Sequence, residues 1–162
     1  MNNIKLLKNL ELINIWMFSY DEGNDNELIL DCNRVLFDLK NYELSIEDRD
    51  GKIIVTINQK NEIYSSCDII KIDLRNILLE FSETNYYLKK IGLINFESSS
   101  GDIFCDALDI NLISKNYGSQ NIFIHSGIYG LRIRSSDYYK NNWIKNWYVP
   151  LYGNNLHELW VF

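Results

Sequence analysis

Alternation of apolar and polar side chains with a period of two residues runs through most of this sequence and constrains the chain to a β fold. The clearest case lies at 42–59, where two such runs flank Asp50-Gly51. An Asp-Gly pair readily adopts the positive φ angles that a two-residue hairpin turn requires. The sequence therefore predicts a β-hairpin over residues 42–59.

Apolar or alternating runs recur along the rest of the chain, with turn residues about every 8 to 14 positions, a spacing typical of a β-sandwich or a partly open barrel. No repeat or linker divides residues 1–162. We therefore expect a single all-β, mostly antiparallel domain of about 8 to 11 strands. The predicted strands outside the hairpin lie at 10–18, 27–32, 35–39, 63–64, 69–72, 92–96, 103–113, 122–125, 128–134 and 156–162.

The strand at 10–18 is predicted to have one well-buried face and a second face that is partly covered. Strict alternation divides its side chains into two sets. One face carries Leu10, Leu12, Asn14, Trp16 and Phe18, and the other carries Glu11, Ile13, Ile15 and Met17.

Residues 73–81 carry a helical pattern within this β sequence. Asp73 lies at the start of this segment, where it could serve as the N-cap of a helix. Asn76 and Ser82, however, are indifferent helix formers. Residues 73–81 can therefore form either a short helix of about two turns or another strand. No other segment of the sequence has a periodicity that predicts a helix. The apolar residues spaced as one helix face are Leu74, Ile77, Leu78 and Phe81.

Charge is distributed unevenly. Residues 1–114 carry 20 acidic and 11 basic side chains, whereas residues 115–162 carry 2 acidic and 5 basic ones, for a net charge of −6. An acidic protein is repelled by phosphate backbones and attracted to basic proteins, so we expect a basic protein partner and not nucleic acid. The candidate protein-binding acids are Asp21, Glu22, Asp25, Glu27 and Asp31, with Glu47, Asp48 and Asp50 at the hairpin end.

A second candidate binding region is the aromatic segment 138–152, in which tyrosines and tryptophans are threaded with asparagines and lysines. This composition is typical of interface hot spots and also of platforms on which sugars stack. Core rings at a sheet edge are a third interpretation. The residues assigned to protein binding are Tyr138, Tyr139, Trp143 and Trp147.

Motifs for catalysis or metal binding do not occur in the sequence. His125 and His157 lie in no triad signature, and the three cysteines have no C-x-x-C spacing. We therefore expect no enzyme activity, no cofactor and no metal. Cys32, Cys67 and Cys105 are predicted to be free thiols. No stretch of 18 apolar residues occurs, and with no export signal recognised we expect a cytoplasmic protein without a membrane span.

The C-terminal part of the sequence resembles small bacterial β-sandwich inhibitor and immunity proteins, such as the competence-nuclease inhibitor and toxin-immunity proteins. The resemblance is carried by Ser126-Gly127-Ile128-Tyr129-Gly130-Leu131-Arg132-Ile133-Arg134, an aromatic-rich loop, and Glu158-Leu159-Trp160. Ser126 stands where those proteins usually have proline. The resemblance implies an inhibitor that binds another protein, and it assigns no binding residues.

These observations lead to a ranked set of functions. The first is an immunity or inhibitor protein that neutralises a basic, nuclease-type bacterial toxin through an acidic surface. The second is a carbohydrate- or ligand-binding β domain that uses residues 138–152. The third is a phage-encoded inhibitor of a host nuclease complex. The oligomeric state stays open.

Overall fold

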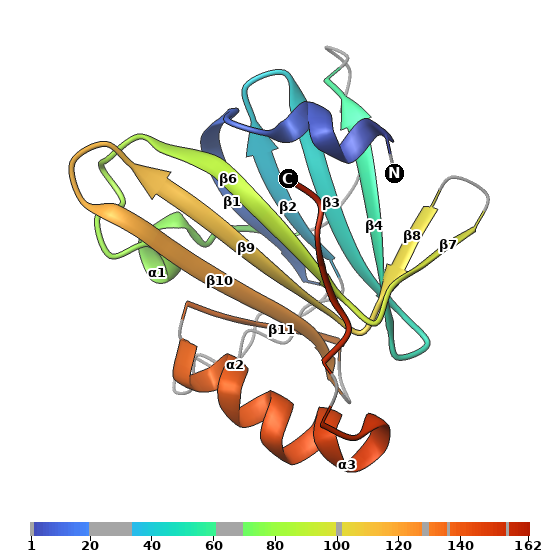
Figure 1. Ribbon diagram of the computed structural model, residues 1–162. Coiled ribbons are helices and arrows are strands. Elements are labelled where there is room, and N and C mark those ends of the chain that lie inside the picture. Colours follow the sequence, from blue (N-terminus) through green and yellow to red (C-terminus); the bar gives the residue numbers. More distant parts are fainter. Residues whose placement is uncertain are drawn as a thin grey trace.

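A computed structural model of the protein describes residues 2–19, 34–60, 70–99, 102–127, 130–135, 137–154 and 156–162 (Figure 1). The strands are β1 (Glu11–Ser19), β2 (Arg34–Leu39), β3 (Tyr42–Arg49), β4 (Lys52–Gln59), β5 (Ile70–Asp73), β6 (Tyr86–Ile94), β7 (Glu97–Ser99), β8 (Asp102–Cys105), β9 (Ala107–Ser114), β10 (Gly118–Gly127), β11 (Gly130–Arg134) and β12 (Glu158–Trp160). The helices are η1 (Asn2–Leu7), α1 (Arg75–Leu78), α2 (Asp137–Trp143), η2 (Ile144–Tyr148) and α3 (Val149–Tyr152).

The strands of the described residues form one open, antiparallel sheet in the order β11-β10-β9-β6-β1-β2-β3-β4-β8-β7. β5 pairs with β1 and β12 pairs with β6 beside this path. The predicted all-β, mostly antiparallel class is confirmed. The sheet has 12 strands instead of 8 to 11, because β7 is not among the predicted strands and the predicted run 103–113 divides into β8 and β9, and it does not close into a barrel. The predicted strands at 27–32 and 63–64 lie outside the described residues.

The predicted hairpin is confirmed as β3 and β4, which pair from Tyr42 with Gln59 to Arg49 with Lys52. Asp50 and Gly51 form the turn with φ angles of 55° and 79°. Positive φ at both central residues gives the turn a twist that matches the twist of the two strands. The turn therefore projects from the sheet in the conformation that the dipeptide favours.

The strand β1 differs from its predicted alternation. A bulge between Leu12 and Asn14 inserts one extra residue opposite β2. The bulge reverses the faces, so that Leu12 is buried together with Ile15 and Met17, whereas Ile13 is exposed. The assignment of residues 10–18 to two strictly alternating faces is therefore wrong beyond Leu12.

The helical alternative for residues 73–81 is realised as a single turn, α1. The Asp73 carboxylate accepts a hydrogen bond of 2.8 Å from the backbone N–H of Arg75. Leu74 and Leu78 are buried, whereas Ile77 and Phe81 are exposed. The helix is shorter than predicted because the chain leaves it at Leu79 for a turn that leads into β6.

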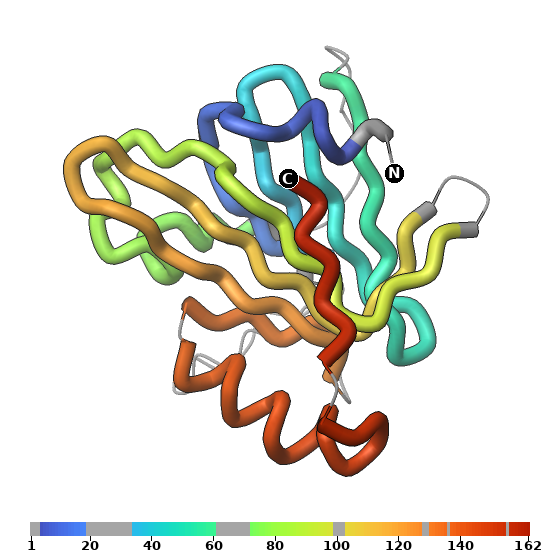
Figure 2. The backbone as a smooth tube through the Cα atoms, viewed as in Figure 1, coloured from blue at the N-terminus to red at the C-terminus, as the bar shows by residue number. Residues whose placement is uncertain are grey.

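The main hydrophobic core lies between the curved sheet and the two chain ends. It takes Ile4 and Leu7 from η1 and Val161 from the C-terminal segment. Figure 2 shows that segment running back along β6, with which it pairs through Glu158 to Trp160. A second, smaller cluster lies on the other face of β6, β9 and β10, where side chains from residues 139–148 pack against it.

A helical run from Asp137 to Tyr152, here called the aromatic helix, covers that second cluster (Figure 1). The sequence pattern predicts 73–81 as the one helix, so this longer run corrects it. The aromatic helix is not regular, because its middle part, η2, is a π-helix. A π-helical turn adds a residue to the α-helical spacing and so disturbs the 3.6-residue period.

Candidate functional site

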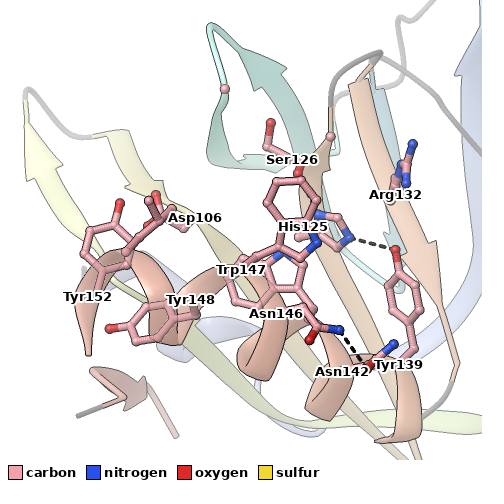
Figure 3. A pocket seen from close by; sticks show the side chains of 14 residues that line it. Asp106, His125, Ser126, Arg132, Tyr139, Asn142, Asn146, Trp147, Tyr148 and Tyr152 are labelled. Carbon is pink, nitrogen blue, oxygen red and sulfur yellow. Dashed lines mark hydrogen bonds between the residues drawn. The ribbon is translucent and has the colours of Figure 1, made fainter. Parts of the chain in front are cut away.

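A pocket of about 450 Å³ opens between the aromatic helix, β10, β11, the β3–β4 turn and the β8–β9 junction (Figure 3). Gly51, Asp106, His125 and Arg132 contribute to it from segments far apart in the sequence. Pockets of this size with mainly apolar and aromatic walls are typical ligand or anchor sites. We call it the aromatic pocket, after the rings that line it: Tyr139, Trp143, Trp147, Tyr148 and Tyr152.

The π-helical turn determines which of these rings face the sheet. Tyr139 and Trp143 are four residues apart and both pack on Phe123 of β10. The next inward ring is Tyr148, five residues further on, and it is buried. Trp147 is thereby turned outward, with 62% of its surface exposed. The irregular turn thus places one tryptophan at the mouth of the pocket.

His125 connects the sheet to the aromatic helix at the back of the pocket. Its Nδ1 lies 2.6 Å from the backbone oxygen of Ser126, and its Nε2 lies 2.7 Å from the Tyr139 hydroxyl (Figure 3). A carbonyl oxygen only accepts hydrogen bonds, so Nδ1 carries the proton and, in the neutral ring, Nε2 accepts from Tyr139. The buried imidazole therefore holds Tyr139 in place.

One end of the pocket is acidic. Asp106, which follows β8, accepts hydrogen bonds from Lys52 Nζ at 2.8 Å and from Asn95 Nδ2 at 2.7 Å. The negative charge of Asp106, burial and a hydrogen bond to the same carboxylate raise the pKa of Tyr152 above 10. The hydrogen bond to Asp106 likewise raises the pKa of Lys52 above 10.5. The field of this carboxylate therefore reaches the aromatic wall.

The acidic end of the β3–β4 hairpin lies beside the same pocket. Ser126, in the pocket wall, donates a hydrogen bond to Asp48. Asp48 also accepts from the backbone N–H of Gly51 at 3.3 Å. Since Gly51 lines the pocket and Asp50 precedes it in the turn, the hairpin end forms part of the rim.

The aromatic helix is fixed to the sheet by a cluster of charges. Lys140 of α2 donates to Asp109 of β9 and, at 2.9 Å, to Glu158 of β12. Gly92 of β6 makes room for this cluster, since a Cβ atom there would lie 2.8 Å from Glu158 Oε1 and 3.2 Å from the Trp160 ring. The position of the pocket therefore depends on a nearly buried ion cluster.

The structure brings together part of the predicted binding site. Tyr139, Trp143 and Trp147 line the pocket, whereas Tyr138 is exposed outside it. Asp48 and Asp50 lie at its rim, and Glu47 pairs instead with Arg34 at 3.4 Å and Arg49 at 4.0 Å. The other predicted acids lie outside the described residues: Asp21, Glu22, Asp25, Glu27 and Asp31.

Several residues of the pocket carry no local sequence signal. Asp106, His125 and Arg132 come from the β8–β9 junction, β10 and β11, and only the fold brings them together. Leu151 is an ordinary apolar residue whose exposure, 71%, is evident only in the structure. Asn142 and Asn146, joined by a hydrogen bond of 3.0 Å, belong to the predicted aromatic segment.

Protein-family models, curated proteins and solved structures yield no match to this chain. The site must therefore be interpreted from its own geometry. In the described ranges, no three His, Cys, Asp or Glu side chains are grouped so as to hold a metal ion. No helix in those ranges is both long and apolar enough to cross a membrane. Cys105 is a buried free thiol, and burial raises its pKa to about 12.

Proposed function

We propose that this protein is an intracellular inhibitor, of the immunity-protein kind, that binds a basic protein such as a nuclease-type toxin. The observation that carries the proposal is the meeting of two features at one place. Exposed apolar side chains of the aromatic helix surround a pocket whose rim includes the acidic end of the β3–β4 hairpin.

Exposure favours a macromolecular partner. Trp147 and Leu151 are 62% and 71% exposed, and Tyr138 outside the pocket is 77% exposed. Large apolar side chains gathered on one surface mark interaction sites, and tryptophan and tyrosine are the residues that most often dominate binding energy. The exposure of Trp147 and Leu151 at the mouth of the pocket therefore supports a protein partner, which would cover both side chains.

Charge favours a basic partner. Asp48 and Asp50 lie at the rim and Asp106 lies in the wall. A nuclease binds phosphate and therefore presents lysine and arginine at its own active site. Complementary charges speed association and make the association rate dependent on salt. Occlusion of such a site needs binding alone, with no catalytic group on the inhibitor.

The test is binding to the product of the gene directly upstream, because immunity genes lie beside the genes of their toxins. We expect a complex that inactivates this product and protects cells that express it. The double variant Trp147→Ala/Leu151→Ala is expected to bind about 30-fold more weakly or worse, since each anchor side chain contributes more than about 1 kcal/mol. Calorimetric titration of the purified pair measures the loss.

The matched control is Tyr117→Ala, which removes an exposed ring in the β9–β10 turn, away from the aromatic helix. This variant is expected to bind like the wild type. Equal affinity of the double variant and the wild type would exclude the aromatic helix as the binding surface. If the upstream product neither binds nor is inactivated, the inhibitor proposal is wrong.

A carbohydrate is the second candidate ligand, favoured by the amide pair Asn142 and Asn146 beside the rings of the pocket. Amide groups bond sugar hydroxyls while aromatic faces stack on the sugar ring. In this case a glycan array should show saturable binding that is lost in both Trp147→Ala and Asn146→Ala and kept in Tyr117→Ala. Absence of saturable binding on the array would remove this candidate.

A further inference from the structure

The surface that the aromatic pocket presents to a ligand consists mainly of the faces of aromatic rings. Among the described residues that line it, Leu151 is the one side chain with a branched aliphatic end, beside five aromatic rings. The hydroxyl of Tyr139 bonds His125, and that of Tyr148 accepts from the backbone N–H of His157 at 3.2 Å. The face of an aromatic ring carries partial negative charge, so these walls attract cations.

A carboxylate stands at one end of the pocket, that of Asp106, which also pairs with Lys52 Nζ at 2.8 Å. Asp106 lies in the wall at that end, and its negative charge raises the pKa of Tyr152 in the same wall. A cation between this ring and this carboxylate would be attracted by both the ring face and the negative charge. Arg132, the cation of the pocket lining, lies at the opposite end, with His125 between it and Asp106 in Figure 3.

The protein itself shows the type of contact that these rings form. The Arg134 guanidinium lies over the Tyr139 ring, 5.4 Å from its centroid. The Arg34 guanidinium lies 5.3 Å from the centroid of Phe18 in the same way. A guanidinium is planar and more weakly hydrated than an ammonium, so it stacks on rings at a smaller desolvation cost.

We infer that the partner inserts an arginine side chain into the aromatic pocket, with its guanidinium against Trp147 and Tyr152 at the Asp106 end. This inference rests on the proposed function and names the group that anchors the partner. The aliphatic part of the arginine would lie along Leu151 and the mouth of the pocket. The carboxylates of Asp48 and Asp50 would face further basic side chains of the partner.

The test uses the full-length protein and two probes of nearly identical shape. N-acetylarginine amide carries the guanidinium, and N-acetylcitrulline amide replaces it with a neutral urea group. We expect arginine to shift the indole N–H resonances of Trp143 and Trp147 saturably, with Kd in the millimolar range (about 4 kcal/mol). Citrulline should bind at least about five-fold more weakly, because it retains the shape and lacks the charge.

Variants locate the binding. Trp147→Leu should abolish the arginine-dependent shifts of Trp143, whereas Tyr117→Leu should leave them unchanged. Equal binding of arginine and citrulline, or tighter binding of N-acetylleucine amide, would overturn the inference. If arginine fails while the complex with the upstream product still depends on Trp147, the proposed function stands and the arginine anchor is wrong. If arginine binds while no complex forms, the anchor stands and the inhibitor function is wrong.

Discussion

Lys140→Met is expected to lower the free energy of unfolding by about 3 kcal/mol, because it leaves nearly buried carboxylates without their counter-charge. The side chains of Asp109 and Glu158 are only 4% and 13% exposed, and both accept from the Lys140 ammonium. Methionine keeps the length of the side chain and removes the charge. Urea denaturation at pH 7 measures the loss.

Lys145→Met is the matched control, since it makes the same chemical change at an exposed position of the same helix. We expect it to change stability by less than about 0.5 kcal/mol. Adding Asp109→Asn to Lys140→Met should restore part of the lost stability, because the more deeply buried carboxylate becomes neutral. If Lys140→Met is no more harmful than Lys145→Met, the cluster does not hold the helix.

The same cluster predicts a dependence on alkaline pH. Burial would lower the pKa of Lys140, but hydrogen bonds to Asp109 and Glu158 outweigh it and raise this pKa above 10.5. A group whose pKa rises on folding contributes fully below its unfolded pKa and loses that contribution as pH passes the folded value. The stability difference between wild type and Lys140→Met should therefore be constant below about pH 10 and shrink above it.

Local chemistry explains which parts of the fold the sequence predicts. The β3–β4 hairpin depends on Asp50-Gly51 and on residues that face each other across a two-residue turn, so a short window contains all the information. No short stretch of sequence contains the information that determines the bulge in β1. It depends on how Leu12 and Ile13 meet Arg75, about 60 positions further along the chain.

The hydrophobic periodicity of the sequence does not predict the aromatic helix, and the reason is physical. Its tyrosines, tryptophans and asparagines are weak helix formers, and the π-helical turn replaces the expected inward position, Trp147, by Tyr148. Packing on Phe123 and Ile94 stabilises the helix instead of intrinsic propensity. Composition therefore identified the aromatic segment as a candidate site, while its shape, and the contribution of Asp106, needed the tertiary structure.

Arg75→Met is expected to lower the free energy of unfolding by about 3 kcal/mol. Several hydrogen bonds from a charged donor are lost together, and each contributes less than a fully buried one because the site is partly open to solvent. The guanidinium donates to the backbone oxygens of Leu12 and Ile13 in the β1 bulge, at 3.2 and 2.5 Å. It also donates to those of Ser82 and Thr84 in the turn before β6, both at 2.7 Å. Urea denaturation at pH 7 measures the effect.

Two comparisons separate this role of Arg75 from a general effect of charge. Arg49→Met removes an exposed guanidinium at the hairpin end and should change stability by less than about 0.5 kcal/mol. Arg75→Lys keeps the charge but replaces the planar fork by one ammonium, so it should recover only part of the loss. Amide hydrogen exchange should accelerate first in the bulge and in the turn at 82–84. If Arg75→Lys is as stable as the wild type, charge alone is sufficient and the fork geometry does not hold the bulge to the turn.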